Sequence, residues 1–301
     1  MENIFKSVVN NPLRILNKAG NFPFMGNLFY QRYFIKAKEV GIKKLFLVLS
    51  FDCDTQRDIE VVSSMHDKLI DLKIRPVYCV PGEILIKEKD VFKNLLLKGA
   101  EFINHGYKIH SKYDENKRIY ESTFFYDINE IEKIKNDIYD GHEAIKEVLG
   151  FSAKGFRIPH FGLIQDECSL KKIHLILSLC GYTFSTSTVP YYSFKYGPIF
   201  NNFGLKEIPL SGRWSNPFRV LDSYSFINKE SIFDGNKYLI EGSKIANRFS
   251  KKISAGILNY YVDPSQINDN ELFFKTIARW QQISYSVSYN SLLDELANLK
   301  L

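Results

Sequence analysis

Short apolar runs alternate with longer amphipathic stretches along most of the chain. Continuous apolar runs are typical of strands buried in a parallel sheet, whereas apolar positions three and four residues apart are typical of helices packed on one face. Strands are predicted at residues 43–51, 76–80, 101–104, 153–157, 182–186, 205–210 and 255–262. Helices are predicted at residues 57–72, 89–98, 127–149, 168–180 and 271–300. This alternation predicts an α/β architecture with a mainly parallel sheet.

Polar side chains follow several of these predicted strands, where parallel barrels and sheets gather their active sites. They are Asp52, Asp54, His105, His110, Arg157 and Asp263. Asp52 and Asp54 are two residues apart, so a strand would direct both carboxylates to one face. Two imidazoles and one carboxylate, with positions left for water, suit a catalytic Zn²⁺ or a similar divalent ion. Such an ion lowers the pKa of bound water and polarises a carbonyl oxygen.

Each of these features has a commoner structural explanation when it is taken alone. An Asp-x-Asp at a strand end often caps a helix or bonds a loop, and most isolated histidines are solvated or packed in the core. The order of the motifs is more specific. Leu49–Thr55, Leu97–Tyr107 and Gly155–Gly162 resemble, in this order, three motifs of the polysaccharide deacetylase family, also called the NodB-homology domain or carbohydrate esterase family four. Pro76–Gly82 is similar to the family's second strand.

The resemblance implies a distorted (β/α)7-type, NodB-like barrel over residues 43–301, with residues 1–42 as an N-terminal arm packed on it or flanking it. It implies that Asp52 is the general base, that Arg157 orients Asp52, and that Asp54, His105 and His110 hold the metal. An ionised base is required to take a proton from water, and a neighbouring arginine favours that form.

The chain departs from the family pattern at two places. The family's histidines are normally four apart, whereas His105 and His110 are five apart. A bulge or loop could absorb the extra residue, or His110 could lie outside the metal site. The family's final Leu-x-His-Pro motif corresponds to Asn259–Pro264, which puts Asp263 where the general-acid histidine is expected. Asp263 could act as the acid only if burial or nearby carboxylates raised its pKa.

Four further residues are candidates for contacting the substrate. Pro159 and His160 follow Arg157 directly, and His160 could also replace the missing acid, although a loop histidine is the commoner outcome. Trp214 could face a sugar ring, or simply pack in a loop. Arg213 could contact a phosphate or a uronate, or face water.

Composition and charge limit the classes of molecule that the protein is expected to bind. Hydrophobic residues make up 45% and charged residues 25%, as in an ordinary soluble enzyme, and the net charge is +6. Lys and Arg are spread along the chain, which favours an anionic membrane surface or a phosphate-bearing substrate over nucleic acid. Cys53 and Cys79 lie in predicted strands and the sequence has no C-x-x-C pair, so we expect buried thiols and a reducing compartment.

Neither a secretory signal nor a long apolar span is visible, so we expect a cytoplasmic protein. The aromatic segment 11–36 could rest on the inner face of a membrane or pack on the barrel. The leading hypothesis is a metal-dependent hydrolase that removes an N-acetyl or similar acyl group from an amino sugar, such as a nucleotide- or lipid-linked saccharide of surface glycan biosynthesis. The alternatives are a catalytically inactive carbohydrate-binding protein on the same fold and an amidohydrolase acting on a non-sugar amide. The sequence does not specify the oligomeric state.

Overall fold

The computed structural model describes residues 12–228, 232–250 and 255–298. The start of the N-terminal arm and the last residues of the predicted final helix lie outside these ranges. A nine-stranded sheet forms the centre, with the strand order β10-β1-β2-β3-β6-β7-β9-β8, and β11 pairs with β1. All pairings in it are parallel except that of β8 with β9. The strands are β1 (Leu45–Asp52), β2 (Pro76–Val80), β3 (Glu101–Asn104), β6 (Gly155–Phe156), β7 (Phe184–Ser185), β8 (Phe200–Asn202), β9 (Leu205–Glu207), β10 (Gly256–Val262) and β11 (Tyr285–Ser286).

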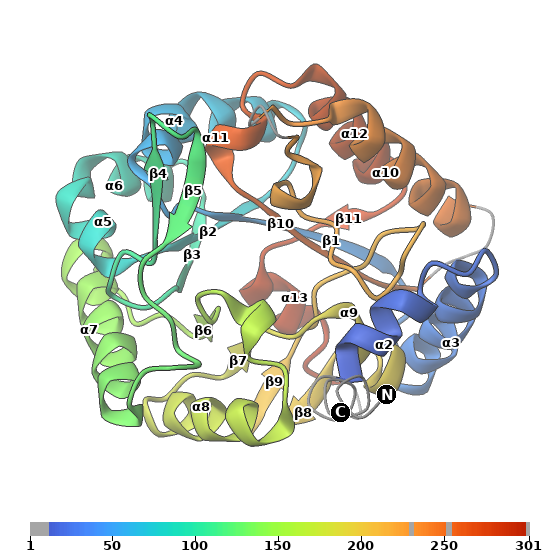
Figure 1. Ribbon diagram of the computed structural model, residues 1–301, viewed down its shortest axis with the longest axis horizontal. Helices are drawn as coiled ribbons and strands as arrows, with labels where there is room; N and C mark the ends of the chain where they lie inside the picture. Colours follow the sequence, from blue (N-terminus) through green and yellow to red (C-terminus); the bar gives the residue numbers. More distant parts are fainter. Residues whose placement is uncertain (1–11, 229–231, 251–254, 299–301) are drawn as a thin grey trace.

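Helices surround the sheet as an outer ring (Figure 1). Those that follow strands are α4 (Gln56–Asp71), α5 (Gly82–Lys87), α6 (Lys89–Leu97), α7 (Ile131–Leu149), α8 (Glu167–Leu179), α9 (Pro190–Tyr196), α10 (Gly235–Ser250), α11 (Pro264–Ile267), α12 (Glu271–Gln281) and α13 (Tyr289–Glu295). Two helices of the N-terminal arm, α2 (Pro12–Ala19) and α3 (Met25–Glu39), precede β1. The predicted α/β fold with a mainly parallel sheet is therefore confirmed.

Strand pairing stops between β9 and β10, where side chains complete the ring. Asn259 on β10 donates through Nδ2 to the carbonyl oxygens of Ile208 and Pro209, and its own carbonyl accepts from Ser211 N at 2.8 Å. Tyr289 on α13 donates to Asn259 Oδ1 at 2.7 Å from inside the barrel. Buried amide and hydroxyl groups thus replace a backbone ladder at this position, and this irregularity distorts the barrel.

Most predicted elements have the expected bounds within a few residues, and β2 and β3 have the predicted ones. The single helix predicted over 271–300 is wrong. It is interrupted by β11, because Val287 N donates to Leu47 O and carries residues 285–287 along β1. Ser288 then caps α13 by accepting from Ser291 N.

The N-terminal arm is joined to the barrel by buried aromatic side chains. Tyr33 of α3 donates to Ile257 O at 2.7 Å and accepts from Ile257 N at 2.8 Å. Its hydroxyl therefore forms hydrogen bonds with both backbone polar groups of one residue on β10. Phe29 and Tyr30 are buried beside it. Among the described residues, no helix is long and apolar enough to cross a membrane.

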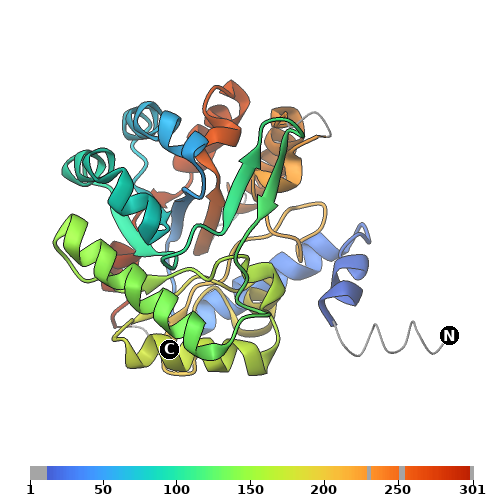
Figure 2. The ribbon, with the colours of Figure 1, turned by 60° about the vertical axis from the view of Figure 1, so that its left-hand side comes forward.

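A two-stranded hairpin, β4 (Ser111–Asp114) and β5 (Ile119–Ser122), was not predicted from the sequence. It projects beyond the ends of the central strands (Figure 2). Tyr120 of the hairpin lies with its hydroxyl 3.1 Å from Ser265 Oγ, so the hairpin contacts the segment that follows β10.

Candidate metal centre and active site

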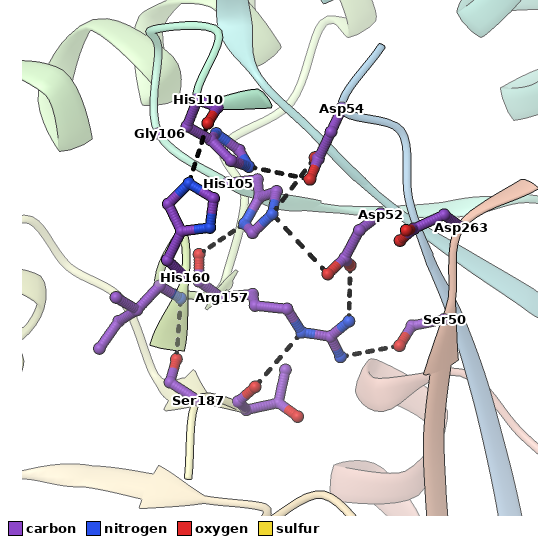
Figure 3. A network of polar contacts seen from close by, with 12 residues as sticks. Ser50, Asp52, Asp54, His105, Gly106, His110, Arg157, His160, Ser187 and Asp263 are labelled. Carbon is purple, nitrogen blue, oxygen red and sulfur yellow. Dashed lines mark hydrogen bonds and ion pairs between the residues drawn. The ribbon is translucent and has the colours of Figure 1, made fainter. Parts of the chain in front are cut away.

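The three predicted metal ligands lie together beyond the ends of β1 and β3 (Figure 3). One ligand atom from each of Asp54, His105 and His110 can be chosen so that all lie within 4.8 Å of one another. His110 Nε2 is 3.1 Å from Asp54 Oδ2, and His105 Nε2 is 3.5 Å from Asp54 Oδ1. The five-residue spacing therefore does not separate the two imidazoles.

A loop, rather than a helix, accommodates the extra residue between the histidines. Gly106 has φ +80°, and a Cβ there would lie 2.3 Å from Asp137 Oδ2. Asp137 on α7 also accepts from Lys108 N at 2.7 Å, and Glu83 accepts from Ile109 N at 2.8 Å. Two carboxylates from neighbouring helices thus hold the loop backbone in a conformation that places His110 beside His105 and Asp54.

Backbone carbonyls set the orientation of both rings. His105 Nδ1 lies 2.8 Å from the carbonyl oxygen of Arg157, and His110 Nδ1 lies 3.3 Å from that of Lys108. A carbonyl can only accept, so each Nδ1 carries the proton and each Nε2 has a lone pair for a metal. Burial lowers the pKa of His105 to about 4, which keeps this ring neutral. Burial also acts on His110, but the adjacent Asp54 carboxylate raises its pKa overall.

Asp54 carries the negative charge of this cluster. Burial opposes its ionisation, yet His110 and His105 lower its pKa to about 2. His110 Nε2 and Asp54 Oδ1 are buried and have no hydrogen-bond partner among the described residues. Unsatisfied buried polar atoms are costly, and a cation coordinated by this nitrogen and this oxygen would satisfy both. The residues therefore fit a divalent metal.

Asp52 is paired with a fully buried arginine beside the three ligands. Arg157 donates from Nη1 to Asp52 Oδ1 at 2.6 Å and from Nη2 to Ser50 Oγ at 2.7 Å and to Tyr289 OH at 2.9 Å. Asp52 Oδ2 is left on the side of His105 Nε2, 3.8 Å away. Because its carbonyl oxygen holds His105 while its guanidinium holds Asp52, Arg157 fixes these two side chains relative to each other.

Asp52, Asp54 and His105 line a cavity of about 220 Å³, and Asp58 and Asp263 also line it. Asp58 joins its two sides: it accepts from Thr55 N after β1 and from Ser265 N and Oγ after β10. Burial raises the pKa of Asp58 to about 6, against the effect of these hydrogen bonds. Burial, and then the carboxylates of Asp58, Asp54 and Asp52, raise the pKa of Asp263 well above its usual value. Asp263 therefore meets the condition for a protonated carboxyl.

The four predicted substrate contacts have different locations. His160 lines the cavity, and its Nε2 lies 2.8 Å from the carbonyl oxygen of His110. Pro159 is buried and does not line the cavity. Arg213 lines a neighbouring cavity. Trp214 lines neither cavity: it stacks on Tyr30 of the arm, with ring centroids 5.5 Å apart and planes at 12°.

The sequence reasoning missed several residues that line the cavity, including Asp58, Tyr261 and, from the hairpin, Ser111, Tyr120 and Ser122. Tyr261 could have been found, since alternation along β10 puts it on the same face as Asn259 and Asp263. Tyr113 and Tyr120 flank the turn Asp114-Glu-Asn-Lys117, which is a weak hairpin signal.

Comparisons with known proteins support the fold. No family model matches the sequence, and no curated protein matches it. Among solved structures, the chain is similar to a protein from Mycobacterium smegmatis assigned as a polysaccharide deacetylase, with 15% identity, a TM-score of 0.63, and 85% and 91% of the two chains covered. It is also similar to a pseudoenzyme of carbohydrate esterase family four from Bacillus anthracis, with 14% identity, a TM-score of 0.51, and 85% and 67% covered. A mutant of that pseudoenzyme with restored enzymatic activity has 14% identity, a TM-score of 0.50, and 85% and 69% covered. At these identities the likeness shows the polysaccharide-deacetylase fold.

Proposed function

On the basis of this fold and the clustered ligand groups, we propose that the chain is a metal-dependent hydrolase. It removes an N-acetyl or similar small acyl group from an amino sugar in a glycan or glycan precursor. The observation that carries the proposal is the convergence of Asp54, His105 and His110 beside the buried Asp52–Arg157 pair. That set combines metal ligands with an oriented carboxylate, as metal-assisted hydrolysis of an amide requires.

Asp54, His105 and His110 would hold the metal. Zn²⁺ is the ion that best suits a set of two imidazoles and one carboxylate. When bound, the ion activates water and polarises the acyl carbonyl. Asp52 takes a proton from the attacking water through Oδ2, because Oδ1 is engaged by Arg157. Arg157, which is fully buried, keeps the carboxylate oriented and balances its charge.

Asp263 protonates the departing nitrogen. Breaking the amide C–N bond leaves an amine, which needs a proton to depart, while the carbonyl carbon gains the water oxygen. Asp263 faces the same cavity as Asp52, and its raised pKa keeps a proton available. The two carboxylates have different surroundings: Arg157 forms an ion pair with Asp52, whereas other carboxylates surround Asp263.

A non-catalytic carbohydrate-binding protein is the second candidate, favoured by the structural likeness to a pseudoenzyme. Hydrolysis of a non-sugar amide is the third. The complete ligand set and the intact Asp52–Arg157 pair favour the enzyme over the binding protein. A substrate screen separates sugar amides from other amides.

We place the protein at the cytoplasmic face of a membrane. Phe22, Phe24, Leu28 and Ile35 of the arm are exposed, and Arg32 and Lys38 of the same segment are exposed as well. Apolar side chains interspersed with cations favour an anionic membrane surface. Cosedimentation with vesicles containing anionic lipid, lost in Phe24→Ser, would support this location; a protein that stays in the supernatant contradicts it.

Metal analysis tests the proposed function. We expect about one equivalent of divalent metal per chain in the purified protein, lost in His110→Ala. The matched control is His142→Ala on α7, whose ring bonds Tyr182 outside the site and whose loss should leave the metal bound. The loaded protein should release acetate from an acetylated amino sugar. Absence of metal after incubation with Zn²⁺ or Co²⁺ would move the assignment to the non-catalytic binding protein.

A further inference from the structure

A second cavity, of about 590 Å³, adjoins the metal cavity. The two share four lining residues, Ser122, His160, Phe161 and Tyr261. A molecule with its acyl group at the metal ligands could therefore extend across this shared wall into the second cavity. The second cavity is also lined by Arg213 and Arg219, which are absent from the lining of the first.

A tight loop brings these two arginines side by side. Arg213 N donates to Arg219 O at 3.0 Å, and Gly212 forms a β-bridge with Val220. The crossing is so close that a Cβ on Gly212 would lie 2.0 Å from Pro217 O. Asn216 within the loop donates to Asn17 O at 2.7 Å, so the arm, through Asn17, forms part of the cavity wall.

Both guanidinium groups have unused donors. Arg213 Nε donates to Val220 O, whereas its Nη1 and Nη2 make no hydrogen bond within the described part of the chain. Arg219 is exposed, and its side chain makes neither a hydrogen bond nor an ion pair with any described residue. Burial lowers the pKa of Arg213, the carboxylate of Asp222 opposes this effect, and the charge of Arg219 adds a smaller lowering. An anion bound between two guanidinium groups would offset the repulsion of their like charges and accept hydrogen bonds from their free N–H groups.

Asp222 is the only acidic residue that lines this cavity among the described residues. Its Oδ1 accepts from Ser225 N at 2.7 Å, and burial raises its pKa. Two arginines against this one carboxylate give the lining of the second cavity a net positive charge. The metal cavity, in contrast, is lined by four carboxylates, those of Asp52, Asp54, Asp58 and Asp263.

We propose that the second cavity binds a phosphate or diphosphate group attached to the amino sugar, with Arg213 and Arg219 as its ligands. This inference rests on the proposed function, and it names the substrate class as a phosphate-linked saccharide. The volume exceeds the space that a phosphate needs, and Phe161, Leu163 and Phe218 add apolar wall. The group beyond the phosphate, a nucleoside or a lipid, would occupy this remainder.

Titration calorimetry with inorganic pyrophosphate tests the site without requiring turnover. We expect Arg219→Gln to weaken binding about tenfold, as the loss of one charge-assisted hydrogen bond predicts. Arg219→Lys should recover part of the affinity. The matched control is Arg75→Gln, an exposed arginine at the start of β2, at the opposite end of the strands. Equal affinity of Arg219→Gln and the unaltered protein would overturn the proposal.

A second variant separates this site from the metal. His110→Ala, which should lose the metal, is expected to retain pyrophosphate binding; loss of binding there, with Arg219→Gln unaffected, would place the anion at the metal and overturn the inference. Because binding is measured directly, failure to hydrolyse any sugar amide would refute the proposed function and leave the anion site standing. Uridine diphosphate and farnesyl diphosphate then distinguish the sources: tighter binding of the first supports a nucleotide link, and tighter binding of the second supports a lipid link.

Discussion

The two sides of the adjoining metal cavity and second cavity differ in how they are held in place. On one side, which we call the ligand wall, Asp52, Asp54, His105, His110 and Arg157 follow β1, β3 and β6, and neighbouring backbone groups orient them. On the other, which we call the loop wall, residues 208–223 and Asp263 depend on contacts between segments far apart in sequence. Ser223 Oγ accepts from Asp263 N, and Asn216 bonds the arm. The ligand wall thus depends on the ends of paired strands, whereas the loop wall depends on contacts between distant segments.

The largest expected effect is on the ligand wall. Asp52→Asn keeps the shape of the side chain but removes the base, so kcat should fall by about 10²–10⁴-fold while the metal stays bound. Metal content and acetate release measure the two outcomes separately. Asp67→Asn, an exposed carboxylate on α4 paired with Lys98, is the matched control and should leave kcat unchanged. Turnover within a few fold of the unaltered enzyme would remove Asp52 from the mechanism.

The corresponding test of the loop wall is Asp263→Asn, for which we expect kcat to fall by about 10²-fold. An acid must be protonated, so activity should decline as the pH rises through the raised pKa of Asp263. This alkaline limb should disappear in Asp263→Asn. Asp263→His should restore turnover. Its alkaline limb should then lie closer to the ordinary pKa of histidine, about 6.5. An unchanged pH profile in Asp263→Asn would mean that another group donates the proton.

The sequence predicted the ligand wall well because its information is local. A strand followed by Asp52-Cys-Asp54 fixes the direction of both carboxylates by alternation, and parallel pairing brings the ends of β1, β3 and β6 to one edge. The roles of Asp52, Asp54, His105, His110 and Arg157 remain proposals, but their proximity follows from the fold. What the sequence could not decide was the effect of the five-residue spacing, since this depends on Asp137 and Glu83 from two other helices.

The loop wall could not be predicted in the same way. Trp214 and Arg213 are adjacent in sequence, yet one stacks on the arm and the other lines a cavity. The β-bridge between Gly212 and Val220 determines which side chain faces the cavity. The spacing of apolar residues in the sequence does not predict such a bridge. Arg219 escaped notice for the same reason, because its proximity to Arg213 depends on the turn between them.

Gly106→Ala tests whether the loop of the ligand wall needs its unusual backbone. The change introduces a Cβ at φ +80° and at 2.3 Å from Asp137 Oδ2. Gly99→Ala is the matched control, because its φ is +90° and nothing lies within 4 Å of an added Cβ. We expect Gly106→Ala to lower the free energy of unfolding by about 1–3 kcal/mol more than Gly99→Ala, the usual cost of overpacking. Urea denaturation of both variants measures this difference, and equal losses would show that the contact with Asp137 is relaxed at no cost.

The smallest expected effect belongs to His160, which lies on the wall shared by the two cavities. Its Nε2 is 2.8 Å from the carbonyl oxygen of His110, so this nitrogen carries the proton and Nδ1 has none to give. Burial, and then His110, lower the pKa of His160, which keeps the ring neutral. A neutral ring whose only N–H is engaged is a poor acid, so we expect His160 to act by positioning His110.

His160→Asn should therefore lower kcat only about fivefold, the effect of one weakened hydrogen bond, and should weaken metal binding by a similar factor. Asparagine is the suitable replacement because the residue has φ +49°, which asparagine tolerates better than alanine, and its amide can still donate. The pH profile of kcat decides between positioning and proton transfer. Retention of the alkaline limb in His160→Asn, together with its loss in Asp263→Asn, assigns the acid to the loop wall; the reverse result would make His160 the acid and Asp263 a structural carboxyl.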